Sequence, residues 1–201
     1  MPSGLRVRIP PRVPVFRKEN FMTTVINLFG APGAGKSTGA AYIFSKLKLD
    51  GISCEYVSEF AKDKCWENNK EVFARPENQF FIGANQFYRM SCLIDKVDVI
   101  VTDSPIIMNA FYNNTESLGS EYDIIMRRLS EMFRNMNFFI NRVKAYDSNG
   151  RNQTETEASA MARKMRDWLV DKYGSLGFID VCGDKTGYDR IYEIVKNNLK
   201  K

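Results

Sequence analysis

The sequence has no histidine among its 201 residues. This absence excludes Ser-His and Cys-His nucleophilic sites, as well as zinc sites built from imidazole. Proton transfer would have to use carboxylates, lysines or tyrosines. Phosphoryl transfer is compatible with this restriction, because it depends more on positioning and charge neutralisation than on proton shuttling.

Long hydrophobic runs and paired cysteines are also missing. No apolar segment approaches the ~20 residues that cross a bilayer, so we expect no contact with membranes. The four cysteines contain no C-x-x-C pair and stand at positions 54, 65, 92 and 182. Cysteines scattered singly in this way indicate reduced thiols in a cytoplasmic protein. A hydrophobic content of 44% suits one α/β domain.

The net charge of +5 is concentrated at the start of the chain. Residues 1–21 hold five basic residues against one glutamate, and therefore carry +4 of the total. They also hold four prolines, which predicts an extended and disordered tail ahead of a domain over residues 22–201. A basic tail could hold a polyanion such as DNA. We favour the other interpretation, a leader with no part in catalysis.

The most specific motif is Gly30-Ala-Pro-Gly-Ala-Gly-Lys-Ser37, which fits the phosphate-binding pattern G-x-x-x-x-G-K-[ST]. A β-branched strand precedes it and an Ala- and Lys-rich helix follows, as this loop requires. The glycines allow backbone N–H groups to point at phosphate oxygens, and the helix N-terminus adds partial positive charge. Lys36 would reach the β- and γ-phosphates, and the Ser37 hydroxyl would bind Mg²⁺. The expected nucleotide-binding residues are Gly30, Ala31, Pro32, Gly33, Ala34, Gly35, Lys36, Ser37 and Thr38.

The rest of the chain alternates between strand and helix patterns. The predicted strands are residues 24–29, 53–58, 97–102, 137–140 and 177–182. The predicted helices are residues 37–49, 77–94, 122–135, 154–173 and 189–200, while residues 106–120 have an irregular pattern rich in Asn, Ser and Gly. This alternation predicts an α/β fold with a parallel sheet covered by helices on both faces. Its ligands are expected at the carboxyl ends of the strands.

Two carboxylates follow predicted strands. Asp103 comes after the third strand and could hold the Mg²⁺ bound by Ser37, although an Asp-Ser-Pro turn is the plainer interpretation. Glu59 comes after the second strand and could orient and deprotonate an acceptor hydroxyl, unless it only caps the next helix. The candidate residues for the acceptor pocket are Glu59, Lys62, Asp63, Gln86 and Arg89; Trp66 is more typical of a core residue.

Two further segments could contact the nucleotide. The polar stretch at residues 141–153 could form a lid, with Arg142, Lys144 or Arg151 neutralising charge on the transferring phosphate. Gly183, Asp184 and Lys185 follow the fifth strand, where the base or ribose would lie. The N-K-x-D motif that reads guanine does not occur in the sequence, which favours ATP.

Four segments taken together resemble small P-loop kinases of the nicotinamide riboside kinase-like type, an AAA-type ATPase or kinase group with many bacteriophage members. These segments are residues 26–38, 57–63, 99–105 and 149–153. The resemblance implies a three-layer P-loop kinase fold with strand order 2-3-1-4-5, ATP with Mg²⁺, and a closing lid. Similar phage proteins phosphorylate hydroxymethyl groups of pyrimidines in DNA, as a step toward DNA modification.

The sequence therefore supports two functions. The first is an ATP-dependent kinase acting on a hydroxyl of a nucleoside, a nucleotide or a modified base in DNA. In that case Lys36, Glu59, Asp103, Arg142 and Arg151 form the catalytic set, with the base left open between Glu59 and Asp103. The second is an ATPase switch that acts through a protein partner, with Asn109 or Gln153 orienting water. The sequence makes no prediction of the oligomeric state.

Overall fold

The computed structural model describes residues 22–69, 71–113, 115–145, 154–174 and 177–199. The predicted tail at residues 1–21 lies outside this part of the chain, and so do Arg151, Gln153 and most of the predicted lid. Within the described ranges, none of the helices is both long and apolar enough to cross a bilayer.

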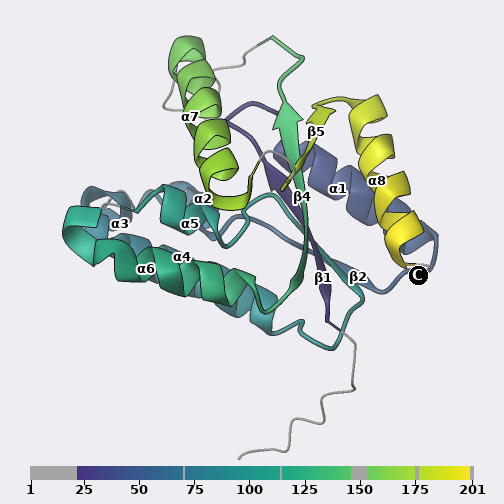
Figure 1. The fold of residues 1–201 in the computed structure, drawn as a ribbon, viewed down its shortest axis with the longest axis horizontal. Helices are drawn as coiled ribbons and strands as arrows, with labels where there is room; N and C mark the ends of the chain where they lie inside the picture. Colours follow the sequence, from purple (N-terminus) through teal and green to yellow (C-terminus); the bar gives the residue numbers. More distant parts are fainter. Residues whose placement is uncertain (1–21, 70, 114, 146–153, 175–176, 200–201) are drawn as a thin grey trace, which may run out of the picture.

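A five-stranded parallel sheet forms the centre of the molecule (Figure 1). Its strands are β1 (Thr24–Phe29), β2 (Cys54–Val57), β3 (Val99–Thr102), β4 (Arg134–Asn141) and β5 (Ile179–Cys182). They lie in the order β2-β3-β1-β4-β5, as the resemblance implied. All five predicted strands are therefore confirmed. Because the strands are parallel, their carboxyl ends share one edge, where β1 lies between β3 and β4.

Helices cover both faces of the sheet. They are α1 (Lys36–Leu49), α2 (Phe60–Trp66), α3 (Glu71–Ala74), α4 (Gln79–Ser91), α5 (Met108–Phe111), α6 (Thr115–Ser130), α7 (Glu155–Tyr173) and α8 (Lys185–Leu199), with a 3₁₀ turn at Pro76–Asn78. Figure 1 shows α1 and α8 on one side of the sheet and α4 to α7 on the other.

Each face of the sheet has its own hydrophobic core. Ile26, Leu28 and Val101 point toward α1 and α8, where they pack with residues such as Ile43 and Ile191. The alternate positions of the strands supply the second core, which includes Val25, Phe29, Ile100, Met126 and Leu169. This alternation follows from the two-residue period of a strand. Burial of each such side chain stabilises the fold by about 1.5–3 kcal/mol.

The structure corrects one helix–strand boundary. The sequence predicts helix over residues 122–135, but α6 ends at Ser130 and β4 begins at Arg134. The missed start of this strand contains a polar residue, Asn135. The Asn27 amide donates to the side-chain oxygen of Asn135 at 2.8 Å, and also to that of Asn137 at 3.0 Å. An amide ladder between neighbouring strands thus satisfies polar groups that sequence patterning assigns to solvent.

Two other predictions also need correction. Residues 106–120 are not irregular, since they contain α5 and the start of α6, with Gly119 in a non-helical conformation. The last helix begins at Lys185 and not at residue 189. Gly187 reads as a loop residue in the sequence, but a Cβ there would lie 2.0 Å from the Cys182 carbonyl oxygen. The glycine allows the first turn of α8 to pack closely against the end of β5.

Candidate nucleotide and acceptor site

The loop between β1 and α1 has the backbone of a phosphate cradle. Gly30, Gly33 and Gly35 have φ of 143°, 81° and 95°, which side-chain-bearing residues rarely adopt. Gly30 also lies against β4, since a Cβ there would be 2.8 Å from the Ile140 carbonyl oxygen. Gly35 is the N-cap of α1, so the unpaired N–H groups of the first turn face the loop. Such a concentration of donors at a helix N-terminus binds anions.

The Lys36 ammonium extends back over this loop. It donates to the carbonyl oxygens of Gly30 at 2.6 Å and Ala31 at 3.2 Å. These contacts hold a positive charge at the mouth of the cradle. A phosphate entering the loop would therefore meet both the charge and the backbone donors.

Ser37 and Asp103 meet at the carboxyl edge of the sheet. The Ser37 hydroxyl lies 2.5 Å from Asp103 Oδ2. Asp103 is 4% exposed, and its other oxygen, Oδ1, has no hydrogen-bond partner among the described residues. A buried carboxylate oxygen without a partner is costly unless a cation or water satisfies it.

The Ser37 hydroxyl and the Asp103 carboxylate together fit a Mg²⁺ ion. Mg²⁺ commonly binds one or two protein oxygens and completes its shell with phosphate oxygens and water. The described residues contain no group of three or more Asp, Glu, Cys or His side chains suited to a metal, and a nucleotide-bound Mg²⁺ needs none. Ser37 and Asp103 would be its protein ligands.

Glu59 lies at the junction of β2 and α2. It occupies the N-cap position of α2, but its side chain accepts no capping hydrogen bond from the described backbone there. Burial raises the pKa of its carboxyl group, and the nearby Asp103 charge adds to this rise, whereas Lys36 and Lys62 oppose it. The charges of Lys36 and Asp103 therefore both act on the Glu59 carboxyl group. A carboxylate with a raised pKa at this position is suited to accept a proton.

Sequence reasoning missed two tyrosines beside these carboxylates. Tyr56 lies on β2, on the face toward α1; its pKa is raised by burial and by the charge of Asp103. Tyr112 follows α5, and burial together with the Glu59 charge raises its pKa to about 12. Its phenol group is desolvated, although 49% of the residue as a whole is exposed. Strand alternation could have found Tyr56, but no sequence signal pointed to Tyr112.

Three of the residues predicted for the acceptor pocket are Lys62, Asp63 and Arg89. Lys62 is exposed, and its positive charge opposes the rise in the pKa of Glu59. Asp63 and Arg89 form an ion pair with each other, and the Arg89 guanidinium lies 4.9 Å from the ring centre of Phe60.

Gln86 does not line an acceptor pocket. It is 1% exposed; its Oε1 accepts from the Phe60 N–H at 2.8 Å, and its Nε2 donates to the Ser58 carbonyl at 3.4 Å. Both ends of this amide are bonded to the backbone on either side of Glu59. The prediction that Gln86 lines the pocket is therefore corrected: it holds the backbone of Glu59 in place. Trp66, which we expected in the core, is 75% exposed.

Of the predicted lid, the structure describes only the beginning. Arg142 donates to Glu155 at 2.8 Å and to Ser159 at 3.2 Å, both in the first turns of α7. Lys144 is exposed. Arg151 is outside the described residues, so its predicted role stays a prediction.

The segment predicted to contact the base lies behind the phosphate loop. A Cβ on Gly183 would be 2.2 Å from the Ala34 carbonyl oxygen. Asp184 accepts from the Gly187 N–H at 2.9 Å and so caps α8. Lys185 donates to Asp189 at 2.8 Å. These contacts give the segment a role in packing α8 against the loop, and its contact with a base stays a prediction.

Comparison with solved structures supports the fold. One similar structure is the NadR protein in complex with NR, with a TM-score of 0.62 and 12% identity; the match covers 90% of this chain and 52% of that one. The chain thus spans about half the length of that protein. Another is thymidylate kinase from Candida albicans, with a TM-score of 0.57 and 12% identity, covering 88% of this chain and 92% of that one. At this identity the likeness shows the fold alone.

The comparison with curated proteins found no match. The family described as AAA domain matches residues 25–182, which include the phosphate loop, Glu59 and Asp103. Family membership and the loop geometry together imply that the protein binds a nucleotide. The chain belongs to the AAA domain family and has a P-loop fold with strand order β2-β3-β1-β4-β5.

Proposed function

We propose that the protein is an ATP-dependent phosphotransferase that moves the γ-phosphate of ATP to a hydroxyl of a nucleoside- or nucleotide-type acceptor. One observation carries this proposal: burial raises the pKa of the Glu59 carboxyl group, and the charges of Lys36 and Asp103 both act on that group. A P-loop explains how phosphates bind, but not why a proton acceptor lies next to them. A kinase needs such a group near the γ-phosphate, on the side from which the acceptor enters.

The proposed reaction breaks the bond between the γ-phosphorus and the β,γ-bridging oxygen. The acceptor oxygen forms a new bond to the γ-phosphorus, its proton passes to the Glu59 carboxylate, and ADP leaves with the bond electrons. Lys36 and the loop amides would hold the phosphates in position and stabilise the negative charge of the transition state. Both effects lower the activation free energy. Asp103 remains the other candidate for the base, but its contact with Ser37 favours the metal role.

A Mg²⁺ ion bound by Ser37 and Asp103 would neutralise charge on the phosphates when the nucleotide is present. Arg142 and Arg151 of the predicted lid would close over the γ-phosphate. Arg142 is already oriented by Glu155 and Ser159, so such a closure would exchange at least one of these bonds for a phosphate oxygen. A guanidinium can make this exchange because it presents several donors in one plane.

The proposed acceptors include the hydroxymethyl group of a modified pyrimidine in phage DNA. The two similar structures are a thymidylate kinase and a protein in complex with NR, which favours a nucleoside-like acceptor. A base within duplex DNA would have to leave the stack to reach Glu59. The nearly neutral charge of residues 22–201 favours a free nucleoside or nucleotide over DNA, since DNA binding depends on basic contacts.

The alternative function is an ATPase switch without an acceptor. It needs a group that orients water toward the γ-phosphate, and Asn109 was a candidate. The Asn109 amide donates to the Ile106 carbonyl at 3.0 Å and accepts from Gln79 at 2.9 Å, and the residue is 5% exposed. These bonds hold Asn109 in the core of the α4–α5 region, which favours the kinase.

Transfer of γ-labelled phosphate from ATP tests the proposal. The acceptor panel holds nucleosides, nucleoside monophosphates, nicotinamide riboside, and DNA with and without hydroxymethylpyrimidines. We expect label on one class of acceptor, and none with the Lys36→Ala variant. Label released only as inorganic phosphate, whatever acceptor is added, would favour the ATPase switch and reject the kinase.

A further inference from the structure

Tyr188 joins α8 to the last glycine of the phosphate loop. It lies one turn into α8 and is 4% exposed. Its phenol donates a hydrogen bond to the Gly35 carbonyl oxygen at 2.9 Å. The same oxygen also accepts from the Gly39 N–H at 2.9 Å, the first bond of α1. Two donors therefore fix the direction of the Gly35 carbonyl.

The position of this carbonyl determines the direction of a phosphate-facing donor. The Gly35 carbonyl and the Lys36 N–H belong to one planar, trans peptide group, so they point in opposite directions. With the carbonyl held toward Tyr188 and Gly39, the Lys36 N–H points away from α1, into the loop. This N–H lies at the start of the helix, where backbone N–H groups are directed at a bound anion. A change in the carbonyl direction would rotate it away from a bound phosphate.

The tyrosine ring occupies space that two glycines leave open. A Cβ on Gly35 would lie 2.4 Å from the Tyr188 hydroxyl, and a Cβ on Gly39 would lie 2.6 Å from its Cε1. The ring thus rests directly on the backbone of the loop and of α1. Gly35 also has φ of 95°. Because glycine has access to many backbone conformations, contacts with neighbouring residues are needed to keep it in this one. The contact is suited to restrain the most flexible residue of the cradle.

We infer that Tyr188 is a positioning residue for the nucleotide site, acting from α8 through the Gly35–Lys36 peptide group. The inference rests on the proposed nucleotide site, but not on the identity of the acceptor. Tyr188 itself would touch no phosphate. Its hydroxyl would pre-organise the Lys36 amide, so that binding a phosphate requires less ordering of the loop.

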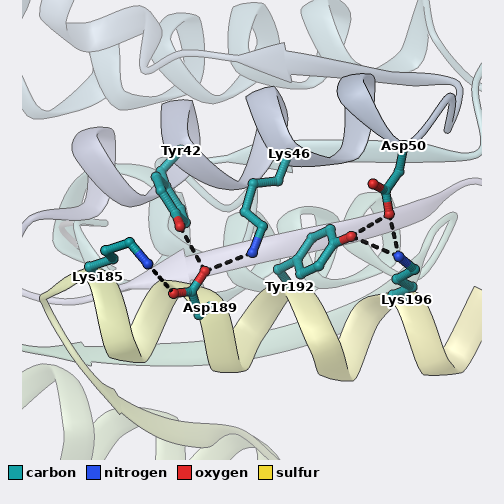
Figure 2. Close-up of polar contacts among 7 residues, drawn as sticks. All are labelled: Tyr42, Lys46, Asp50, Lys185, Asp189, Tyr192 and Lys196. Atoms are coloured by element: carbon teal, nitrogen blue, oxygen red, sulfur yellow. Dashed lines mark hydrogen bonds and ion pairs between the residues drawn. The ribbon is translucent and has the colours of Figure 1, made fainter.

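The same helix supplies a matched control. Tyr192 lies one turn further along α8, is also 4% exposed, and also bonds to α1 through its phenol. Its partner is Asp50 at the other end of α1, where Lys196 bonds to the same carboxylate (Figure 2). Loss of either tyrosine hydroxyl removes one hydrogen bond between α8 and an end of α1. Only Tyr188 makes its bond at the phosphate loop.

The experiment compares Tyr188→Phe with Tyr192→Phe. Both variants keep the ring and lose only the hydroxyl. Hydrogen exchange of the free protein is followed at the amides of residues 33–37, and the affinity for ATP is measured by titration. A lost hydrogen bond of about 1 kcal/mol corresponds to a factor of about five. We expect about five-fold faster exchange and about five-fold weaker ATP binding in Tyr188→Phe, and changes below about two-fold in Tyr192→Phe.

A merely structural role would give a different result. If α8 only stabilises the fold, the two variants should change exchange in the loop and ATP affinity to the same extent, and that outcome overturns the inference. Unchanged exchange in Tyr188→Phe overturns it as well. Gly39→Ala displaces the ring by another route and should also speed exchange in the loop. Exchange is measured without ligand, so a wild-type protein that phosphorylates no acceptor would reject the kinase proposal and leave this test intact.

Discussion

The Ser37 hydroxyl and Asp103 Oδ2 lie 2.5 Å apart, although 66 positions separate the two residues in the sequence. The contact exists because β1 and β3 are neighbours in the sheet and end at the same edge. Ser37 begins α1 directly after the phosphate loop, and Asp103 directly follows β3. The strand order thus places a hydroxyl and a buried carboxylate where a phosphate-bound metal would need oxygen ligands.

Replacement of Asp103 by asparagine should remove the dependence of nucleotide affinity on Mg²⁺. The amide keeps the size of the side chain but loses the charge that would hold the ion. We expect at least about 100-fold slower phosphate transfer, within the range for loss of one group that stabilises transition-state charge. The measurement is the affinity for ATP with and without Mg²⁺, together with the transfer rate.

Asp98 provides the control for this variant. It lies just before β3, at the opposite end of the strand from Asp103. Asp98→Asn should leave the effect of Mg²⁺ on nucleotide affinity within about two-fold of wild type. An Asp103→Asn protein that still gained affinity from Mg²⁺ as wild type does would remove Asp103 from the proposed metal site.

Replacement of Lys36 by alanine should abolish phosphate transfer and leave the fold intact. The ammonium donates to the loop carbonyls of Gly30 and Ala31, and alanine is a good residue for the first turn of a helix. A loss of about 1 kcal/mol would lower Tm by about 2–4 °C in a domain of this size. Transfer should fall by about 1,000-fold or more, since the γ-phosphate loses its nearest side-chain cation.

Lys48→Ala is the matched control on the same helix. Lys48 pairs with Glu55 at 2.9 Å on the surface, at the far end of α1 from the loop. Surface pairs of this kind contribute about 0–1 kcal/mol. This variant should transfer phosphate at the wild-type rate. Equal activity losses in both variants would mean that charge on α1, and not the position of Lys36, explains the effect.

The sequence predicted the fold where local patterns and global packing agree. Apolar strands and the loop at residues 30–37 follow from the spacing of side chains and glycines, and Asp103 was found because it directly follows a strand. Residues 134–136 at the start of β4 were not predicted as strand, because Asn135 is satisfied by Asn27, more than 100 positions away. A polar residue whose partner is distant in the sequence reads as a surface residue.

The candidate site was predicted less completely than the fold. Glu59 was identified from its position after a strand, but Tyr112 lies within residues 106–120, whose sequence pattern is irregular. Gln86 was expected among the residues of the acceptor pocket. Only the three-dimensional structure shows that both ends of its amide bind the backbone beside Glu59. Sequence patterns place residues on elements, whereas hydrogen-bond partners depend on tertiary packing.

Replacement of Glu59 by glutamine should stabilise the protein at neutral pH and slow the reaction. The folded pKa of Glu59 is raised above its ordinary value of 4.5, mainly by burial. Stability from this group is therefore fully present below pH 4.5 and is lost as pH rises through the folded pKa. The ionised side chain destabilises the fold at pH 7.5, and glutamine removes this charge. Transfer should fall by about 100- to 10,000-fold, the usual effect of losing a general base, while ATP affinity is kept.

Thermal unfolding between pH 4 and pH 8 measures the stability part. The Tm of Glu59→Gln should exceed that of wild type at pH 7.5, and the difference should shrink as the pH approaches 4.5. Glu55→Gln on β2, the strand that precedes Glu59, is the control and should show no such gain, since Glu55 is paired with Lys48 at the surface. A Glu59→Gln protein with wild-type activity would remove Glu59 as the base.

The packing of α4 on α6 should make one glycine-to-alanine change destabilising. Gly83 lies within α4, where alanine is ordinarily better than glycine by about 0.5–1 kcal/mol. A Cβ on Gly83 would, however, lie 2.3 Å from the Tyr122 hydroxyl and 3.0 Å from Met126 Sδ. Tyr122 is 2% exposed and donates to the Gln79 carbonyl at 2.8 Å, so the ring cannot move without loss of this bond. Overpacking costs about 1–3 kcal/mol, and Gly83→Ala should therefore destabilise the protein by about 1–2 kcal/mol.

A double-mutant cycle with Tyr122→Phe tests the cause. Phenylalanine lacks the hydroxyl that the new methyl group would meet, so Gly83→Ala should cost at least about 1 kcal/mol less in the Tyr122→Phe background. Denaturant unfolding of the four proteins gives the coupling free energy. Additivity within about 0.3 kcal/mol would show that Tyr122 does not limit the space at Gly83. The result bears on the acceptor side of the site, because α4 also carries Gln86, which holds the backbone at Glu59.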